Sequence, residues 1–95
     1  MKAGETNMLN ITDYSHILLA GILKQRRKEA GVSQAEIADR LHCYQSYISK
    51  IENGKLHLEV LTAMQYCDAI GTDFTELVQE FREAQSKTTS DDISL

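Results

Sequence analysis

The amino-acid sequence predicts an all-α domain of five helices. Three observations support this prediction: the 95 residues include no Pro, apolar residues recur at spacings of three and four, and no segment alternates apolar with polar residues as a half-buried strand would. Proline removes a backbone donor and clashes inside a helix, so its absence favours uninterrupted helices. A chain of this length forms one domain with a modest core.

The first predicted helix follows a segment without periodicity. We expect residues 1–11 to be a flexible N-terminal arm, and Thr12 or Asp13 to cap a helix that continues to about Ala30. Gly31 ends this helix, because glycine enters the left-handed conformation without a Cβ penalty. Aliphatic residues at helical spacing form its predicted buried stripe: Leu19, Ile22, Leu23 and Ala30.

The second helix has the clearest start in the sequence. Ser33 and Glu36 form an S-x-x-E capping box, in which each side chain satisfies a free backbone donor near the other. Val32 and Ile37 flank the cap as a hydrophobic staple. The helix is expected to end near Leu41, since the apolar positions that follow are out of phase with those before it.

Two more helices are predicted next, and each ends at a turn. The third is expected from about Gln45 to Asn53, where Asn53-Gly54 is a turn dipeptide. The fourth covers residues 59–70 and is closed by Gly71. Its expected core consists of five apolar residues: Val60, Ala63, Met64, Cys67 and Ile70.

The start of the fifth helix is predicted from Asp73 and Glu76, which resemble a second capping box. The segment 86–95 is rich in Ser, Thr and Asp, and we expect it to be a disordered acidic tail. The folded domain is therefore predicted to cover residues 12–85.

The charge is unevenly distributed along the chain. The net charge is −4, yet residues 24–55 contain seven Lys and Arg against four acidic residues, and residues 56–95 contain two against eight. A basic middle and an acidic end fit a protein with one phosphate-facing surface. Both parts could also simply be solvated, so charge alone does not decide between these interpretations.

Several function classes find no support in the sequence. Cys43 and Cys67 form neither a C-x-x-C pair nor a disulfide framework, and we expect two reduced thiols in a cytoplasmic protein. The apolar runs are too short for a membrane span or a signal peptide. His42 beside Cys43 has no second ligand pair, and no catalytic constellation or Gly-rich phosphate loop occurs, so we expect no metal, no cofactor and no enzyme activity.

The second and third predicted helices carry residues suited to a steep crossing through a tight turn. Ala38 is small enough for the point of closest approach. Aliphatic residues occupy the four other contact positions: Ile37, Leu41, Ile48 and Ile51. The strings S-Q-A-E-I-A at residues 33–38 and I-S-K-I-E-N-G-K at residues 48–55 closely resemble the XRE family of Cro and phage repressors, a helix-turn-helix family. The resemblance covers about residues 17–78.

This resemblance implies a five-helix repressor-type domain that binds double-stranded DNA, usually as a homodimer. The positions that face base edges in the family fall on Tyr44, Gln45, Ser46 and Lys50. The positions that contact phosphate fall on Gln34, Asn53 and Lys55. Tyr47 is grouped with these phosphate contacts, although it could equally face the core. Arg27 and Glu52 match a structural pair that links the first helix to the third.

Physical chemistry supports these roles. N-terminal residues of a recognition helix enter the major groove. Gln can contact adenine N6 and N7 together, and Lys can contact guanine O6 and N7. We expect Lys50 to face nearly the same outward side as Gln45. The alternatives are that Gln34 is a solvated first-turn residue, that Lys50 is a surface cation, and that Arg27 with Glu52 is an incidental surface pair.

The sequence departs from the family pattern at three places. His42 stands where the family often has Gly, so a left-handed conformation there would be mildly strained. The loop Leu56-His57-Leu58 lacks the usual Arg or Pro, which leaves fewer cations for the DNA backbone. Arg26 replaces a usual Leu, which slightly weakens the packing of the first helix.

The resulting hypothesis is a sequence-specific transcriptional regulator, a repressor or autoregulator that binds an inverted-repeat operator as a homodimer. The alternative is an antitoxin-like or adaptor module on the same fold, favoured by the acidic final helix and by the loop at residues 56–58. The dimer surface is expected on the fifth helix, on apolar residues that could instead close the monomer core: Phe74, Leu77, Val78 and Phe81.

Overall fold

The computed structural model describes the backbone of residues 2–94 and the side chains of residues 14–87. Its five helices are α1 (Lys2–Glu29), α2 (Gln34–Leu41), α3 (Gln45–Glu52), α4 (Val60–Ile70) and α5 (Phe74–Ser94). No strand occurs between residues 2 and 94. The prediction of an all-α, five-helix domain is therefore confirmed.

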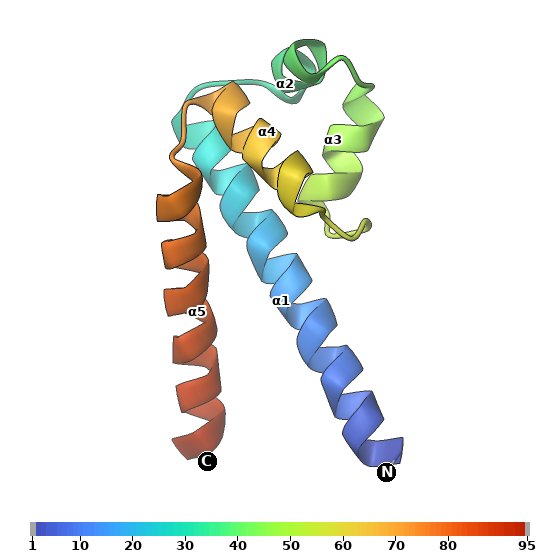
Figure 1. Cartoon of the computed structure of the whole chain (residues 1–95), viewed down its shortest axis with the longest axis vertical. Coiled ribbons are helices and arrows are strands. Elements are labelled where there is room, and N and C mark those ends of the chain that lie inside the picture. The colour runs from blue at the N-terminus through green and yellow to red at the C-terminus, as the bar shows by residue number, and fades with distance from the viewer. Residues whose placement is uncertain (1, 95) are drawn as a thin grey trace.

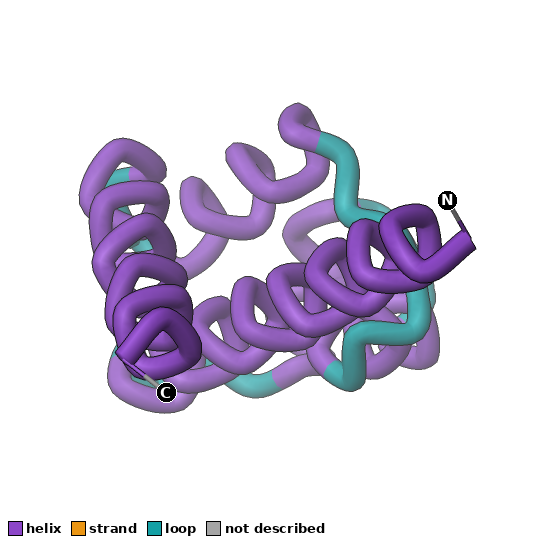
Figure 2. The backbone as a smooth tube through the Cα atoms, turned by 90° about the horizontal axis from the view of Figure 1, so that it is seen from below, coloured by secondary structure: helices purple, strands orange, loops and turns teal. Residues whose placement is uncertain are grey.

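The helices form two groups along the long axis of the molecule. The long helices α1 and α5 lie together where α1 ends and α5 begins, and they diverge toward the two chain ends (Figures 1 and 2). The short helices α2, α3 and α4 gather beside the C-terminal half of α1 (Figure 1). Within residues 2–94, none of these helices combines the length and the apolar character that crossing a membrane requires.

Every helix contributes to one hydrophobic core. The side chains that are completely or almost completely removed from solvent are Leu23, Ile37, Ile48, Ile51, Tyr66, Cys67 and Leu77. These residues come from α1, α2, α3, α4 and α5. Burial of a large apolar side chain contributes about 1.5–3 kcal/mol to stability, so the inner faces of α2 and α3 are firmly held.

The buried face of α4 differs from the prediction. Ala63, Cys67 and Ile70 are buried as expected, but Val60 is 65% exposed and Met64 is 41% exposed. The five predicted positions extend around more of the helix surface than the face that is buried. The buried face of α4 also includes Tyr66, which was not predicted. Ala30 is also exposed, because it lies beyond the last residue of α1. These three core assignments were therefore wrong.

The helix ends confirm the local signals. Gly31 and Gly71 adopt positive φ angles of 74° and 73° directly after α1 and α4, as predicted for left-handed caps. At the start of α5, Asp73 Oδ1 accepts a hydrogen bond of 2.8 Å from the backbone N–H of Thr75.

The outer bounds of the first and last helices differ from those expected. Helix α1 begins at Lys2 instead of near Thr12, and α5 continues to Ser94 instead of ending near residue 85. Neither segment contains Pro, the residue that most strongly prevents a helix from continuing. Helix therefore extends through the expected arm and tail. The division of the chain into folding units at residues 12 and 85 stays a prediction.

Candidate nucleic-acid interface

The start of α2 is fixed by the predicted capping box. The backbone N–H of Glu36 donates to Ser33 Oγ at 3.0 Å, and the backbone N–H of Ser33 donates to Glu36 Oε1 at 2.9 Å. The hydrogen bonds from Ser33 lower the pKa of the Glu36 carboxyl below its usual value. The cap therefore satisfies two backbone donors that a helix start would otherwise leave free.

The turn between α2 and α3 depends on His42. This residue takes the left-handed conformation, with φ 57° and ψ 47°, at the position where the resembling family often has Gly. The backbone N–H of His42 bonds to Asp39 O at 3.3 Å, and that of Cys43 bonds to Ala38 O at 2.9 Å. This pair of bonds closes a Schellman motif, which ends α2 sharply and redirects the chain into α3.

Helix α3 has one buried face and one exposed face. Ile48, Ile51 and Glu52 are buried. The four residues predicted to contact bases are all exposed: Tyr44, Gln45, Ser46 and Lys50. Tyr44, the N-cap residue, is 82% exposed and makes no capping hydrogen bond through its side chain. The amino end of α3 thus offers three neighbouring polar side chains to solvent.

The expected alignment of Lys50 with Gln45 is wrong. Residues five positions apart on a helix are separated by a rotation of about 140°, whereas residues four apart share a face. Lys50 therefore shares its face with Ser46, directly opposite the buried Ile48. Tyr47 is 39% exposed, which disfavours the alternative that it faces the core.

The carboxyl end of α3 is held against α1 by a close approach of glycine. Gly54 has a φ of 70°, and a Cβ atom on it would lie 3.1 Å from Ile17 Cγ1 of α1. Lys55 and Asn53 flank this glycine and are both exposed. Asn53 Nδ2 donates to Ser49 Oγ at 3.3 Å. The predicted phosphate contacts at these two positions thus lie at the opposite end of α3 from Gln45.

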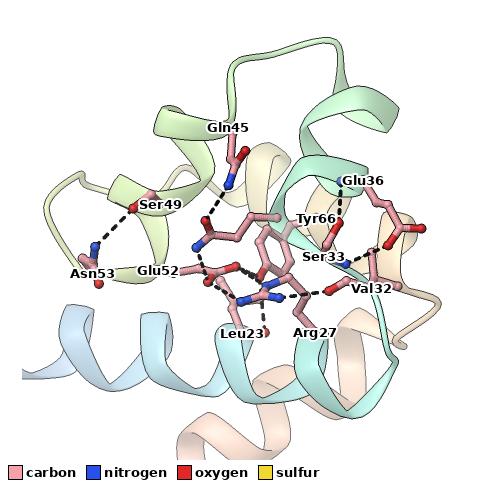
Figure 3. A network of polar contacts seen from close by, with 11 residues as sticks. Leu23, Arg27, Val32, Ser33, Glu36, Gln45, Ser49, Glu52, Asn53 and Tyr66 are labelled. Carbon is pink, nitrogen blue, oxygen red and sulfur yellow. Dashed lines mark hydrogen bonds and ion pairs between the residues drawn. The ribbon is translucent and has the colours of Figure 1, made fainter.

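The predicted pair of Arg27 and Glu52 is confirmed as a buried, two-pronged ion pair. Arg27 Nε donates to Glu52 Oε2 at 2.7 Å, and Arg27 Nη2 donates to Glu52 Oε1 at 3.0 Å (Figure 3). Arg27 Nη1 also donates to Val32 O at 2.9 Å. One guanidinium group therefore joins α1 to α3 and to the segment that leads into α2. Its burial removes the alternative of an incidental surface pair.

Tyr66 completes this cluster and was missed by the sequence analysis. Its hydroxyl group donates to Glu52 Oε2 from the buried face of α4 (Figure 3). A signal existed: Tyr66 continues the helical spacing of Ala63 and Ile70, and a buried Tyr hydroxyl usually finds a polar partner. The identity of that partner depended on the tertiary fold.

The cluster keeps Glu52 ionised and Tyr66 neutral. Burial alone would raise the pKa of Glu52, but hydrogen bonds from Arg27, Tyr66 and Gln34 outweigh that effect and lower it. Burial and the bond to Glu52 strongly raise the pKa of Tyr66. Hydrogen bonding to Glu52 also raises the pKa of Arg27. No described buried side-chain polar atom lacks a hydrogen-bond partner.

Gln34 links this buried cluster to the exposed end of α3. Gln34 Nε2 donates to Glu52 Oε1 at 3.0 Å. Gln34 Oε1 accepts from Gln45 Nε2 at 3.4 Å. Gln34 is half-buried, so the structure does not support its interpretation as a merely solvated residue. The chain of bonds runs from the core to a residue predicted to contact bases.

The predicted dimer residues on α5 mainly serve the core of one chain. Leu77 has no exposed surface, and the half-buried Phe74 and Phe81 pack against the core. Val78 is 38% exposed. The start of α5 uses this stripe to pack against the rest of the domain, so the interface assignment is wrong for Leu77.

The remaining reactive groups form no evident metal or redox site. Among residues 14–87, no three His, Cys, Asp or Glu side chains gather as a possible metal site. Cys43 and Cys67 are free thiols. Burial raises the pKa of both, that of Cys67 to about 11, so neither is strongly ionised at neutral pH.

Comparisons with known proteins agree with this geometry. Residues 23–77 match a family model described as helix-turn-helix. An XRE-family-like protein from Pseudomonas syringae pv. tomato has a similar structure, with a TM-score of 0.77 and 33% identity over 82% of this chain and 95% of that chain. No curated protein is similar enough in sequence to count as a match.

Two more distant structures are also similar. The clp gene regulator ClgR from Corynebacterium glutamicum has a TM-score of 0.72 and 20% identity, over 84% of this chain and 86% of that chain. The restriction-modification controller protein C.AhdI from Aeromonas hydrophila has a TM-score of 0.59 and 21% identity, over 64% and 92% of the two chains. These two likenesses support the fold alone.

Proposed function

The chain belongs to the XRE family of helix-turn-helix proteins, and we propose that this DNA-binding transcription regulator reads operator DNA through α3. The observation that carries the proposal is the arrangement of α3. Its inner face is fixed in the core by Ile48 and Ile51, while its amino end presents Tyr44, Gln45 and Ser46 to solvent. Amino-terminal residues of such a helix are the ones that enter the major groove.

The eight residues predicted to contact DNA divide into two proposed roles. The base contacts are Tyr44, Gln45, Ser46 and Lys50. The phosphate contacts are Gln34, Tyr47, Asn53 and Lys55. The side-chain groups of Gln34 already have partners, so its contribution to phosphate binding falls to its second amide N–H and its backbone N–H at the start of α2.

We propose that the protein acts in the cytoplasm as a homodimer on an inverted-repeat operator. A single recognition helix covers only a few base pairs, which is too short a site to be distinctive in a genome. Two-fold dimers are the commonest oligomers, and their symmetry is matched by an inverted repeat. Occupation of a promoter by such a dimer would exclude polymerase, which makes a repressor or autoregulator the favoured role.

Replacement of Gln45 by Ala is expected to reduce sequence discrimination more than it reduces affinity for random DNA. A two-bond contact to one base contributes about 1–3 kcal/mol of discrimination. Replacement of Asn53 by Ala should instead weaken binding to all sequences alike, since a phosphate contact carries no sequence information. Sites selected from random duplex DNA, followed by titration of each variant, measure both effects. Equal losses for Gln45→Ala on selected and random DNA would contradict the assignment.

A dimer mass is expected by light scattering at micromolar concentration. A footprint on the selected site should protect two half-sites whose centres lie about one helical turn, roughly 34 Å, apart. Insertion of about five base pairs between the half-sites turns one of them to the opposite face of the DNA and should abolish tight binding. A monomer mass together with one protected half-site would refute the dimer.

An antitoxin-like or adaptor protein is the second candidate. Two observations favour it: the side chains of Val60 and Leu61 at the start of α4 are 65% and 71% exposed, and residues 56–95 carry eight acidic against two basic residues. Exposed apolar side chains such as these fit contact with a protein better than contact with DNA. An adaptor would capture the product of a neighbouring gene and fail to retard promoter DNA at low salt.

A further inference from the structure

We propose that Glu52, although buried, determines which base edge Gln45 reads. This proposal rests on the proposed function, since it concerns how α3 contacts DNA. Glu52 lies in the last turn of α3, and Gln45 is the first residue of that helix. The two side chains are joined by Gln34 of α2, through hydrogen bonds of 3.0 Å and 3.4 Å.

The first step is that Glu52 fixes the orientation of the Gln34 amide. An ionised carboxylate only accepts hydrogen bonds, whereas an amide group has a donating and an accepting end. Gln34 must therefore turn its Nε2 toward Glu52 Oε1, which leaves its Oε1 facing Gln45 at the amino end of α3. Glu52 cannot turn away, because Arg27 holds both of its oxygens and Tyr66 donates to one of them.

The second step transmits this orientation to Gln45. Gln34 Oε1 only accepts, so Gln45 must direct one Nε2 hydrogen toward it. Two groups of Gln45 remain for DNA: its accepting Oε1 and the second hydrogen of Nε2. Gln45 is exposed and therefore free to offer both to a ligand.

The third step is the match to a base. Adenine presents a donor at N6 and an acceptor at N7 in the major groove, whereas guanine presents acceptors at both O6 and N7. The orientation set by Glu52 fits adenine. Guanine would place its O6 against Gln45 Oε1, two acceptors that repel. If the orientation is released, the Gln45 amide can turn and offer its NH₂ group to O6, so the preference should fall.

The experiment uses duplex DNA selected from a random pool by the wild-type protein. The base pair most affected by Gln45→Ala is identified, and affinities are measured for duplexes with A or G at that position. The quantity compared is the ratio of the affinity for the A duplex to the affinity for the G duplex. We expect this ratio to be about ten or more for the wild-type protein, as for a good two-bond contact. Glu52→Gln should move this ratio toward one, because a glutamine at position 52 can accept from or donate to Gln34. Gln34→Met should act similarly, whereas Gln65→Met, an exposed control on α4, should keep the wild-type ratio.

The ratio separates base reading from any lost phosphate contact, since such a contact affects both duplexes equally. Where Glu52→Gln does not fold, the double variant Arg27→Met/Glu52→Leu replaces the ion pair by apolar side chains and still removes the carboxylate. If that variant is also unfolded, the test falls to Gln34→Met, which removes the side chain that joins Glu52 to Gln45. A folded variant that keeps the wild-type ratio overturns the inference and leaves DNA binding intact. Absence of wild-type binding to any duplex overturns the proposed function itself, and the inference with it.

Discussion

Replacement of Glu52 by Ala is expected to lower the free energy of unfolding by about 3–5 kcal/mol, because it leaves the buried guanidinium of Arg27 without its partner. The loss also removes the carboxylate that accepts hydrogen bonds from the hydroxyl of Tyr66 and from the amide of the half-buried Gln34. Urea denaturation followed by circular dichroism measures the change.

The control for this prediction is a second ion pair between helices. Arg26 Nη2 lies 2.8 Å from Glu80 Oε1, but both side chains are accessible to solvent. Exposed pairs contribute about 0–1 kcal/mol, so Glu80→Ala should change stability little. A similar small change for Glu52→Ala would mean that the Arg27 cluster is hydrated or differently paired.

Replacement of Ile48 by Ala is expected to lower the free energy of unfolding by about 2–5 kcal/mol. Ile48 has no exposed surface and anchors the centre of α3 in the core. Removal of its methyl groups loses buried apolar contact and leaves a cavity between helices that cannot fully collapse.

The neighbouring Tyr47 provides the matched control for Ile48. Tyr47 is 39% exposed, and Tyr47→Ala should cost clearly less stability than Ile48→Ala. The two variants are compared by their urea midpoints at equal slope. If Tyr47→Ala proved the more destabilising of the two, the face of α3 that packs on the core would be wrongly assigned.

The parts of the structure that were predictable depend on residues close together in the sequence. The capping box of Ser33 and Glu36 and the left-handed Gly31 are formed within a few residues, so local chemistry determines them. The pairing of Arg27 with Glu52 is not local. It was predicted only because the surrounding strings resemble those of a known family.

The errors arose where tertiary packing decides between nearby positions. On α4, Tyr66 is buried and Met64 is exposed. The buried hydroxyl of Tyr66 bonds to Glu52 of α3, a contact between helices that the spacing of residues within α4 does not indicate. On α5, Leu77 is buried in the core of one chain. Its apolar character fits a dimer surface equally well, so the sequence could not decide between the two. The bonds from Gln34 to Glu52 and to Gln45 depend on the crossing of α2 and α3, so spacing within either helix could not predict them.

The salt dependence of DNA binding tests the central claim, that the exposed face of α3 and the turn after it bind DNA. Log affinity for the selected operator should fall linearly with log salt concentration. Lys55→Ala should make this slope shallower by about two in a dimer, one phosphate contact for each chain, whereas Lys87→Ala on α5 should leave it unchanged. An affinity that does not change between roughly 50 and 200 mM salt would contradict a DNA-binding role for this surface.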